Sequence, residues 1–347
     1  MSHSSDKKRK AVIISHQEDL DGIVSSALIQ YYLHTKGYDT NSIIVFLVDY
    51  NTVLSIFDDY AYELNHSDLY FCDIGLNKRL VNRLMNLSNK SDENKNIIRI
   101  YFDHHKINYD ASRTMKIVKD KFSVYENSSL SKPDNDLCTA ETISKYLNIK
   151  STHLNLLAEC AHIIDFKTSE KENENHKFAH DLNRYIVYHQ CKIDRLKALS
   201  FHMTSSTLWN NYASELIKEK TSIDNWYRMG LKRVNLNRQV FTINKIKLVV
   251  SYSYLKAEEI TNYLMKENEK CDIFIGFSES NLYANVQTKQ EISHLIASLF
   301  DGGGHTRRAG FKIPPKVIES IGSDFFRDTF KNIILMKINS FLLNDVL

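Results

Sequence analysis

The sequence has few cysteines and no long apolar run, and each shortage argues against a class of protein. Its five cysteines include no C-x-x-C pair, which argues against a disulfide framework and predicts reduced, mostly buried thiols. No apolar run approaches the roughly 18 residues that a membrane span needs, and no apolar segment typical of a secretory signal follows the polar start. We therefore expect a cytoplasmic protein that contacts no membrane.

The chain also lacks a large excess of either charge. Lys and Arg number 45 against 42 Asp and Glu, a formal net charge of +3, so any polyanion must be bound by a local basic patch. Residues 7–10 are basic; we expect residues 1–10 to be a disordered tail, with a localisation signal or a nucleic-acid contact as the alternatives. The length of 347 residues and the 43% apolar content predict two domains with sizeable cores.

The first half of the chain alternates strand-length apolar runs with helical patterns. Between the first two runs, Val24, Ala27, Leu28 and Tyr31 recur at helical spacing. This alternation predicts an α/β domain with a doubly wound parallel sheet over residues 11–170. The expected strands, rich in β-branched or aromatic residues, are 11–15, 43–50, 69–72 and 97–102, and later helices are expected at 139–147 and 152–164.

The second half has a different pattern. Residues 171–238 are mainly helical in character and are predicted to form a connector, whose length suits either a hinge or a homodimer contact. Residues 239–347 are predicted to form a smaller α/β domain with a mixed sheet. Its expected strands are 240–253, 272–277 and 281–288, with helices at 257–269 and 291–300.

Acidic residues follow several of the predicted strands in the first domain. Asp19 and Asp21 come just after the first strand, and Asp73 and Asp103 end two later strands. The carboxyl ends of parallel strands meet at one edge of a sheet, where ligands bind. Crowded carboxylates repel one another, so a bound cation is the natural way to offset them.

Histidines accompany these acids, and together they predict a metal site. Aspartate with histidine and without cysteine suits Mn²⁺ or Mg²⁺ better than a structural zinc. The number of donors is sufficient for two ions that share a bridging carboxylate, activate a common water and hold a phosphoryl group. The candidate ligands are His16, Asp19, Asp21, Asp73, His104 and Asp165.

Each of these residues also has a simpler explanation when it is considered alone. Asp19 would ordinarily be a helix cap and Asp73 a turn residue, and His104 and His105 could be surface or hydrogen-bonded core histidines. The preference of aspartate for turns does not explain why an acid stands at the end of one predicted strand after another. It also does not explain the glycine run at residues 302–304, followed by His305, in a chain with only 10 glycines.

The combined motifs resemble those of the DHH phosphoesterase superfamily with a DHH-associated C-terminal domain. The resemblance covers about residues 11–315, and the joint occurrence of its motifs is highly specific. Residues 138–141 also look like the helix start that follows the DHH segment in that family. The matching positions are His16-x-x-Asp19-x-Asp21-Gly22, Asp73, Asp103-His104-His105, Asp165 and Gly302-Gly303-Gly304-His305.

The resemblance implies a role for each matched position. Two ions would share Asp73 as the bridging ligand. Asp103 would orient the ring of His104, and His105 would act at the scissile phosphate. The ligands of one ion would be His16, Asp19 and Asp73, and those of the other Asp21, Asp73, His104 and Asp165. The residues that would grip the substrate are Gly302, Gly303, Gly304, His305, Arg307 and Arg308.

By resemblance, the expected activity is hydrolysis of short oligonucleotides, as by a nanoRNase-like exonuclease using two Mn²⁺ or Mg²⁺ ions. The expected partners are short single-stranded RNA or DNA, or small nucleotides. One alternative is a phosphodiesterase for cyclic dinucleotides or a 3′-phosphoadenosine phosphatase. Another is a non-catalytic replication or scaffold subunit, against which the complete ligand set argues. Gln287, Arg307 and Arg308 depart from the family pattern and leave substrate preference open.

Overall fold

The computed structural model describes residues 9–50, 52–87, 97–105, 111–126, 137–166, 174–304 and 306–343. Contacts divide the chain into two compact units, Met1–Lys220 and Thr221–Leu347. The segment predicted as a connector contains three long helices, the last of which continues from one unit into the other. These helices are α8 (Glu174–Tyr188), α9 (Ile193–Met203) and α10 (Ser206–Leu236). The expected tail lies largely outside the described residues.

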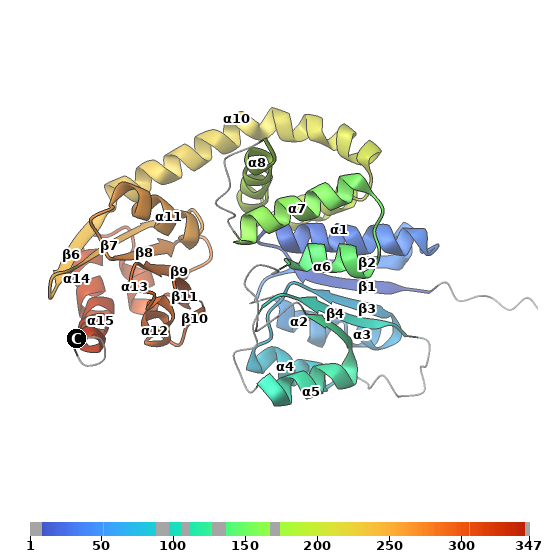
Figure 1. The fold of residues 1–347 in the computed structure, drawn as a ribbon, viewed down its shortest axis with the longest axis horizontal. Helices are drawn as coiled ribbons and strands as arrows, with labels where there is room; N and C mark the ends of the chain where they lie inside the picture. Colours follow the sequence, from blue (N-terminus) through green and yellow to red (C-terminus); the bar gives the residue numbers. More distant parts are fainter. Residues whose placement is uncertain are drawn as a thin grey trace, which may run out of the picture. The chain divides into compact units, whose positions relative to one another are not determined.

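The first unit is built on a five-stranded parallel sheet in the order β2-β1-β3-β4-β5 (Figure 1). This sheet confirms the predicted α/β fold. Strands β1, β3 and β4 are buried along their whole length, as expected for apolar runs inside a parallel sheet. The strands are β1 (Ala11–His16), β2 (Ile43–Val48), β3 (Asp68–Cys72), β4 (Arg99–Asp103) and β5 (Ser123–Glu126).

Helices cover both faces of this sheet (Figure 1). On one face lie α1 (Leu20–Thr35), α6 (Thr139–Tyr146) and α7 (Thr152–Phe166), and α1 contacts both of the others. On the other face, helices share an apolar core with the strands. They are α2 (Val53–Asp59), α3 (Ala61–His66), α4 (Lys78–Met85) and α5 (Ala111–Lys121), and a 3₁₀ turn, η1 (Thr40–Ser42), precedes β2.

The strand order creates a topological switch point between β1 and β3. After β1 the chain crosses to β2 on one side, whereas after β3 it moves to β4 and β5 on the other side. In open α/β sheets, the crevice at the carboxyl ends of the two strands that flank such a point is a common ligand site. His16 ends β1, and Asp73 directly follows β3. The fold therefore brings two of the predicted ligands to this crevice.

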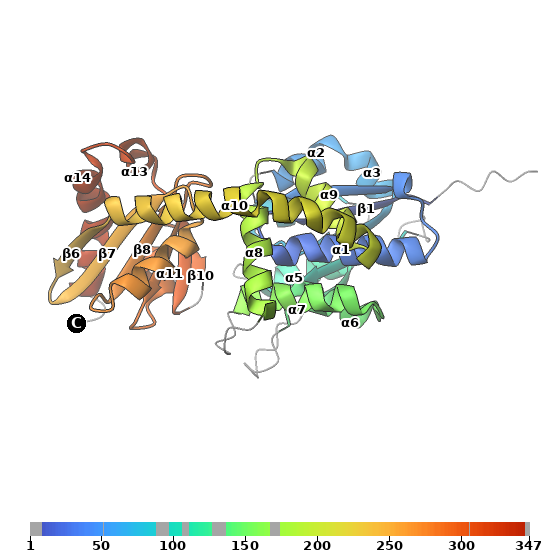
Figure 2. The same ribbon diagram turned by 90° about the horizontal axis from the view of Figure 1, so that it is seen from above.

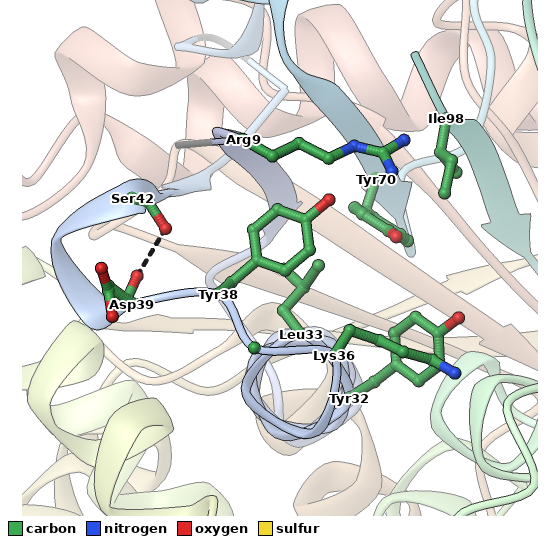
Figure 3. A pocket seen from close by; sticks show the side chains of 10 residues that line it. Arg9, Tyr32, Leu33, Lys36, Tyr38, Asp39, Ser42, Tyr70 and Ile98 are labelled. Carbon is green, nitrogen blue, oxygen red and sulfur yellow. Dashed lines mark hydrogen bonds between the residues drawn. The ribbon is translucent and has the colours of Figure 1, made fainter. Parts of the chain in front are cut away.

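A pocket of about 550 Å³ lies at the opposite, amino-terminal end of the same sheet (Figure 3). Arg9, which forms an ion pair with Asp68, and Tyr38 are among the residues that line it. None of the residues that line it is a predicted metal ligand. The predicted metal ligands are therefore associated with the crevice at the carboxyl ends of the strands and not with this pocket.

The second unit contains a six-stranded mixed sheet in the order β10-β11-β9-β8-β7-β6, which confirms the predicted mixed sheet. Only the β7–β8 pair is parallel among these described strands. The strands are β6 (Gln239–Ile243), β7 (Ile246–Ser253), β8 (Ile273–Ser278), β9 (Tyr283–Thr288), β10 (Gly303–Gly304) and β11 (Arg308–Lys312).

The helices of this unit form separate apolar cores with the two faces of the sheet. Helix α11 contacts β7, β8 and β9, and Figure 2 shows it beside β8. The second core contains Phe326 and Phe330, which pack against Phe277 of β8. The helices are α11 (Ala257–Glu267), α12 (Ser293–Ser298), α13 (Pro315–Ser320), α14 (Phe326–Phe330), the π-helix η3 (Lys331–Leu335) and α15 (Met336–Phe341).

One predicted strand, residues 240–253, is in fact a hairpin. Asn244 and Lys245 have φ values of 45° and 71°, so the chain reverses there and β6 pairs with β7. Two consecutive residues with positive φ are typical of tight hairpin turns, and asparagine tolerates this conformation better than most residues. Among the described helices, none is both long and apolar enough to cross a membrane.

Candidate metal centre

His16 and Asp19 lie at the carboxyl end of β1. One carboxylate oxygen of Asp19 accepts a hydrogen bond from the backbone N–H of Gly22 at 3.2 Å, so Asp19 caps α1. Its second oxygen lies 3.0 Å from Nδ1 of His16. The helix-cap explanation and the ligand explanation are therefore compatible, because each uses a different oxygen.

Gly22 permits the helix to begin directly against the strand. A Cβ atom at this position would lie 2.2 Å from the backbone oxygen of His16, a distance that real side chains do not reach. The close approach brings Asp21, in the first turn of α1, into the interior, where its side chain is 1% exposed. A buried carboxylate needs hydrogen-bond donors.

The first turn of α6 supplies those donors. The backbone N–H groups of Thr139 and Ala140 donate to the two carboxylate oxygens of Asp21 at 2.8 and 2.7 Å. These groups have no partner within their own helix, and the positive end of the helix dipole favours a negative charge. The hydroxyl of Thr139 also donates to Asp73 at 3.1 Å. The start of α6 therefore holds two of the predicted ligands.

Asp73 lies at the centre of the group. Its backbone has a φ of 55°, a left-handed conformation that aspartate tolerates better than most residues. The Asp73 side chain is only 2% exposed. One carboxylate oxygen lies 3.9 Å from Nδ1 of His16, and the other lies 3.4 Å from Nε2 of His104. Asp73 therefore stands between the two predicted ion positions.

His104 connects Asp73 to the two remaining acids. Its Nε2 lies 3.5 Å from Asp165, which belongs to α7, and 3.8 Å from Asp21. Burial lowers the pKa of His104, but Asp21 and Asp165 more than compensate and raise it above its ordinary value. One imidazole nitrogen thus faces three carboxylates that come from three separate segments of the chain.

All six predicted ligands belong to three linked groups. Within each group, one donor atom from every residue lies within 4.8 Å of the others. Asp73 is shared by two groups and His104 is shared by two. The groups are His16, Asp19 and Asp73; Asp21, His104 and Asp165; and Asp73, His104 and His105.

The electrostatics of this cluster fit a divalent cation. Burial, together with the charges of Asp21 and Asp19, raises the pKa of Asp73 and of Asp165 well above the usual range. One oxygen of Asp165 is buried without a hydrogen-bond partner among the described residues. Carboxylate and imidazole donors are a ligand set that divalent cations accept.

Asp103 contacts the ring of His105 instead of the ring of His104. Its carboxylate accepts from Nδ1 of His105 at 2.7 Å, whereas His104 donates to it only through the backbone N–H, at 3.0 Å. Burial tends to raise the pKa of Asp103, but the neighbouring His105 holds it below its usual range. We expected Asp103 to orient the ring of His104, but the contacts differ. The imidazole of His104 is directed at Asp73, Asp21 and Asp165 instead.

Sequence reasoning missed two supporting residues. The hydroxyl of Tyr101 donates to the second oxygen of Asp103, and Thr139 holds Asp73 as described above. Tyr101 reads in the sequence as one more aromatic residue of a buried strand. The resemblance marked residues 138–141 as a helix start, but no spacing rule connects that helix to an acid 66 positions earlier.

The predicted substrate-gripping residues all belong to the second unit. His305 lies outside the described residues. Gly302, Gly303 and Gly304 precede or form the short strand β10. Arg307 donates to Glu291 at 2.7 Å and Arg308 donates to Glu258, so both arginines are paired with glutamates. Their role toward a substrate stays a prediction.

The Asp103–His105 pair predicts an unusual titration. Burial lowers the pKa of His105, but the adjacent Asp103 outweighs it and raises that pKa to about 9. A histidine whose pKa rises on folding contributes its stabilisation fully below about pH 6.5 and loses it as the pH rises through about 9. In the metal-free protein, histidine NMR signals should show one ring that titrates near pH 9, and Asp103→Asn should move its pKa toward 6.5. A wild-type ring that titrates at its ordinary pKa would contradict the pair.

We expect removal of the Thr139 hydroxyl to destabilise the protein. Thr139→Val keeps the shape of the side chain but leaves Asp73 without this donor. It should lower the free energy of unfolding of the metal-free protein by about 1–3 kcal/mol. Thr139→Ser retains the hydroxyl and is the matched control in urea denaturation. Equal losses in the two variants would show that the hydrogen bond contributes little.

No protein-family model matches the chain, and neither does any curated protein. Solved structures do match it. The DHH domain of a member of the s1p family of ribosomal proteins has a TM-score of 0.63 at 10% identity, over 95% of this chain and 87% of that one. Exonuclease RecJ bound to manganese has a TM-score of 0.60 at 11% identity, over 96% and 91% of the two chains. The pGpG-specific phosphodiesterase PggH from Vibrio cholerae has a TM-score of 0.51 at 12% identity, over 96% and 99%. The chain therefore has the DHH fold.

Proposed function

We propose that this protein is a metal-dependent phosphoesterase that binds two divalent cations in its first unit. The observation that carries the proposal is the convergence of six residues, from four separate segments of the chain, into linked groups of donor atoms. A purely structural role is a poor explanation for them, because buried acids that raise one another's pKa destabilise the metal-free fold. Similar folds in a manganese-bound exonuclease and a phosphodiesterase support the same class of reaction.

The two ion positions follow from the groups. His16, Asp19 and Asp73 would hold one ion, and Asp21, His104 and Asp165 would hold the other together with Asp73. Two such ions, when bound, lower the pKa of a water molecule and neutralise charge on a phosphoryl group. The hydrogen bonds from α6 to Asp21 would keep that carboxylate in place as ions enter and leave.

His105 is the candidate proton donor. Its side chain is 42% exposed at the edge of the cluster, and its Nδ1 lies 4.0 Å from Asp73. With a pKa near 9, the ring is protonated at neutral pH. Asp103 holds Nδ1, so Nε2 would be the atom that gives a proton to the leaving oxygen. Asp103 would thus keep the acid both charged and correctly oriented.

The substrate that we favour is a short single-stranded oligonucleotide, cleaved as by a nanoRNase-like exonuclease with Mn²⁺ or Mg²⁺. The names of two structurally similar proteins, an exonuclease and a pGpG-specific phosphodiesterase, support a nucleotide phosphodiester. The second of these also favours a dinucleotide as the second candidate substrate. Both candidates place one phosphodiester at the same metal centre.

A substrate panel tests this proposal. Labelled RNA and DNA of 2 to 20 nucleotides, pGpG, a cyclic dinucleotide and a 3′-phosphorylated adenosine nucleotide are incubated with Mn²⁺, with Mg²⁺ or with EDTA. We expect release of mononucleotides from the shortest strands with either metal, and no release in EDTA. Hydrolysis that persists in EDTA, or no hydrolysis of any phosphodiester, would refute the proposal.

His105→Gln should reduce kcat while the uptake of Mn²⁺ persists.

We expect the removal of a buried acid to affect thermal stability differently with and without metal. A carboxyl group whose pKa is raised on folding destabilises the folded state above its unfolded pKa of about 3.9. Asp165→Asn should therefore raise the melting temperature in EDTA at pH 8. In Mn²⁺ the wild type should gain more stability than the variant, because the variant has lost a ligand.

The matched control for this experiment is Asp59→Asn, which changes an exposed acid at the end of α2. It should melt and take up Mn²⁺ as the wild type does. Calorimetry should show that Asp165→Asn weakens the uptake of one ion by at least about 100-fold, since loss of even an indirect metal contact costs roughly 10–100-fold. Unchanged Mn²⁺ binding in Asp165→Asn would remove this residue from the site.

A further inference from the structure

Tyr50 reaches into the candidate metal centre from the loop after β2. Its hydroxyl oxygen accepts a hydrogen bond from the backbone N–H of Gly75 at 3.0 Å. Gly75 is only two residues from Asp73. The ring centroid of Tyr50 lies 5.8 Å from that of His16, with the ring planes inclined by 55°. One tyrosine thus connects the ends of β2 and β3 beside a predicted ligand.

The space around Gly75 fixes the hydroxyl end of Tyr50. A Cβ atom at Gly75 would lie 3.1 Å from the Tyr50 hydroxyl oxygen and 3.2 Å from Cβ of His105. Because Gly75 has no side chain, the hydroxyl can approach the backbone on the side where His105 also lies. The tyrosine is therefore anchored between a predicted ligand and the candidate proton donor.

Tyr50 as a residue is partly exposed, although its hydroxyl is hydrogen-bonded to the backbone. Tyr50 is 42% exposed, whereas Tyr101, which also contacts the site, is 1% exposed. Tyr101 is explained by its packing and by its bond to Asp103. Among the described residues, no hydrogen bond or ring contact besides those with Gly75 and His16 accounts for the exposed part of Tyr50. A rigid aromatic side chain that is held at its polar end, in a partly exposed residue beside a charged site, is well suited to stack against a planar group.

We propose that Tyr50 is a stacking platform for a nucleobase adjacent to the phosphate at the metal centre. The inference rests on the proposed function and narrows its substrate class to nucleotides, because an inorganic polyphosphate has no planar face to stack on. Every nucleobase has such a face, so the platform would bind nucleotides with little preference among bases. The anchored hydroxyl limits the ring motion that would otherwise be lost on binding.

Three dinucleotides separate stacking from phosphate binding. The first is pApA, and the other two replace either its 5′ or its 3′ nucleoside with an abasic residue that keeps the sugar and the phosphates. In Mn²⁺, Tyr50→Leu should raise the KM for pApA about tenfold, equivalent to about 1.4 kcal/mol. It should leave the KM of one abasic analogue near the wild-type value, and that analogue identifies the stacked base.

Two further variants keep the test specific. Tyr50→Phe retains the ring, so it should still discriminate pApA from that abasic analogue. Tyr62→Leu replaces an exposed tyrosine of α3 that lies outside the cluster, and should behave as the wild type does. Melting temperature and Mn²⁺ uptake, measured for all variants, detect any general loss of structure.

Two results would overturn the inference. Tyr50→Leu could raise the KM equally for pApA and both abasic analogues, which would show that the ring does not contact a base. Tyr50→Phe could lose discrimination as completely as Tyr50→Leu, which would assign the effect to the hydroxyl. If the wild type hydrolyses none of the three, the proposed function fails separately. In that case, calorimetry should compare the affinity of the wild type and of Tyr50→Leu for pApA. Equal affinities would refute the proposal that Tyr50 stacks on a base.

Discussion

The repulsion between buried carboxylates is the constraint on which this structure depends. Asp21 and Asp73 are almost fully buried, and Asp165 and Asp19 lie close enough to contribute to the same electrostatic field. Charges of one sign are not gathered in a protein interior without compensation. Part of the compensation comes from the helix start at Thr139, which donates two backbone hydrogen bonds and one hydroxyl. The remainder is what bound divalent cations would supply.

The fold makes this arrangement by bringing several chain segments to one edge of one sheet. The switch point between β1 and β3 opens a crevice at the carboxyl ends of these strands. The first turn of α1 enters it because Gly22 allows close contact with the end of β1. Helices α6 and α7 then add the donors of Thr139 and the carboxylate of Asp165. The described donor atoms of this arrangement all belong to the first unit.

Much of the fold could be predicted from the sequence, because the governing signals are local. Apolar runs of strand length marked β1 to β4, and the same runs showed which acids would stand at strand ends. The hairpin of β6 and β7 was not predicted, since an apolar run does not reveal a turn whose central residues are Asn244 and Lys245. The short strand β5 at the sheet edge left no clear signal either. The two arginines of the second unit were predicted as substrate contacts without regard to Glu291 and Glu258, which face them.

The sequence by itself determined the types of donor atom in the site and placed several of them at or just after strand ends, because residue chemistry and strand periodicity are properties of short segments. Only the tertiary structure decided which carboxylate faces which ring. It placed Asp103 against His105, brought Thr139 to Asp73 across 66 positions and left Tyr50 partly exposed beside His16. These contacts depend on side-chain direction and on the packing of segments that are distant along the chain, and no local pattern encodes either.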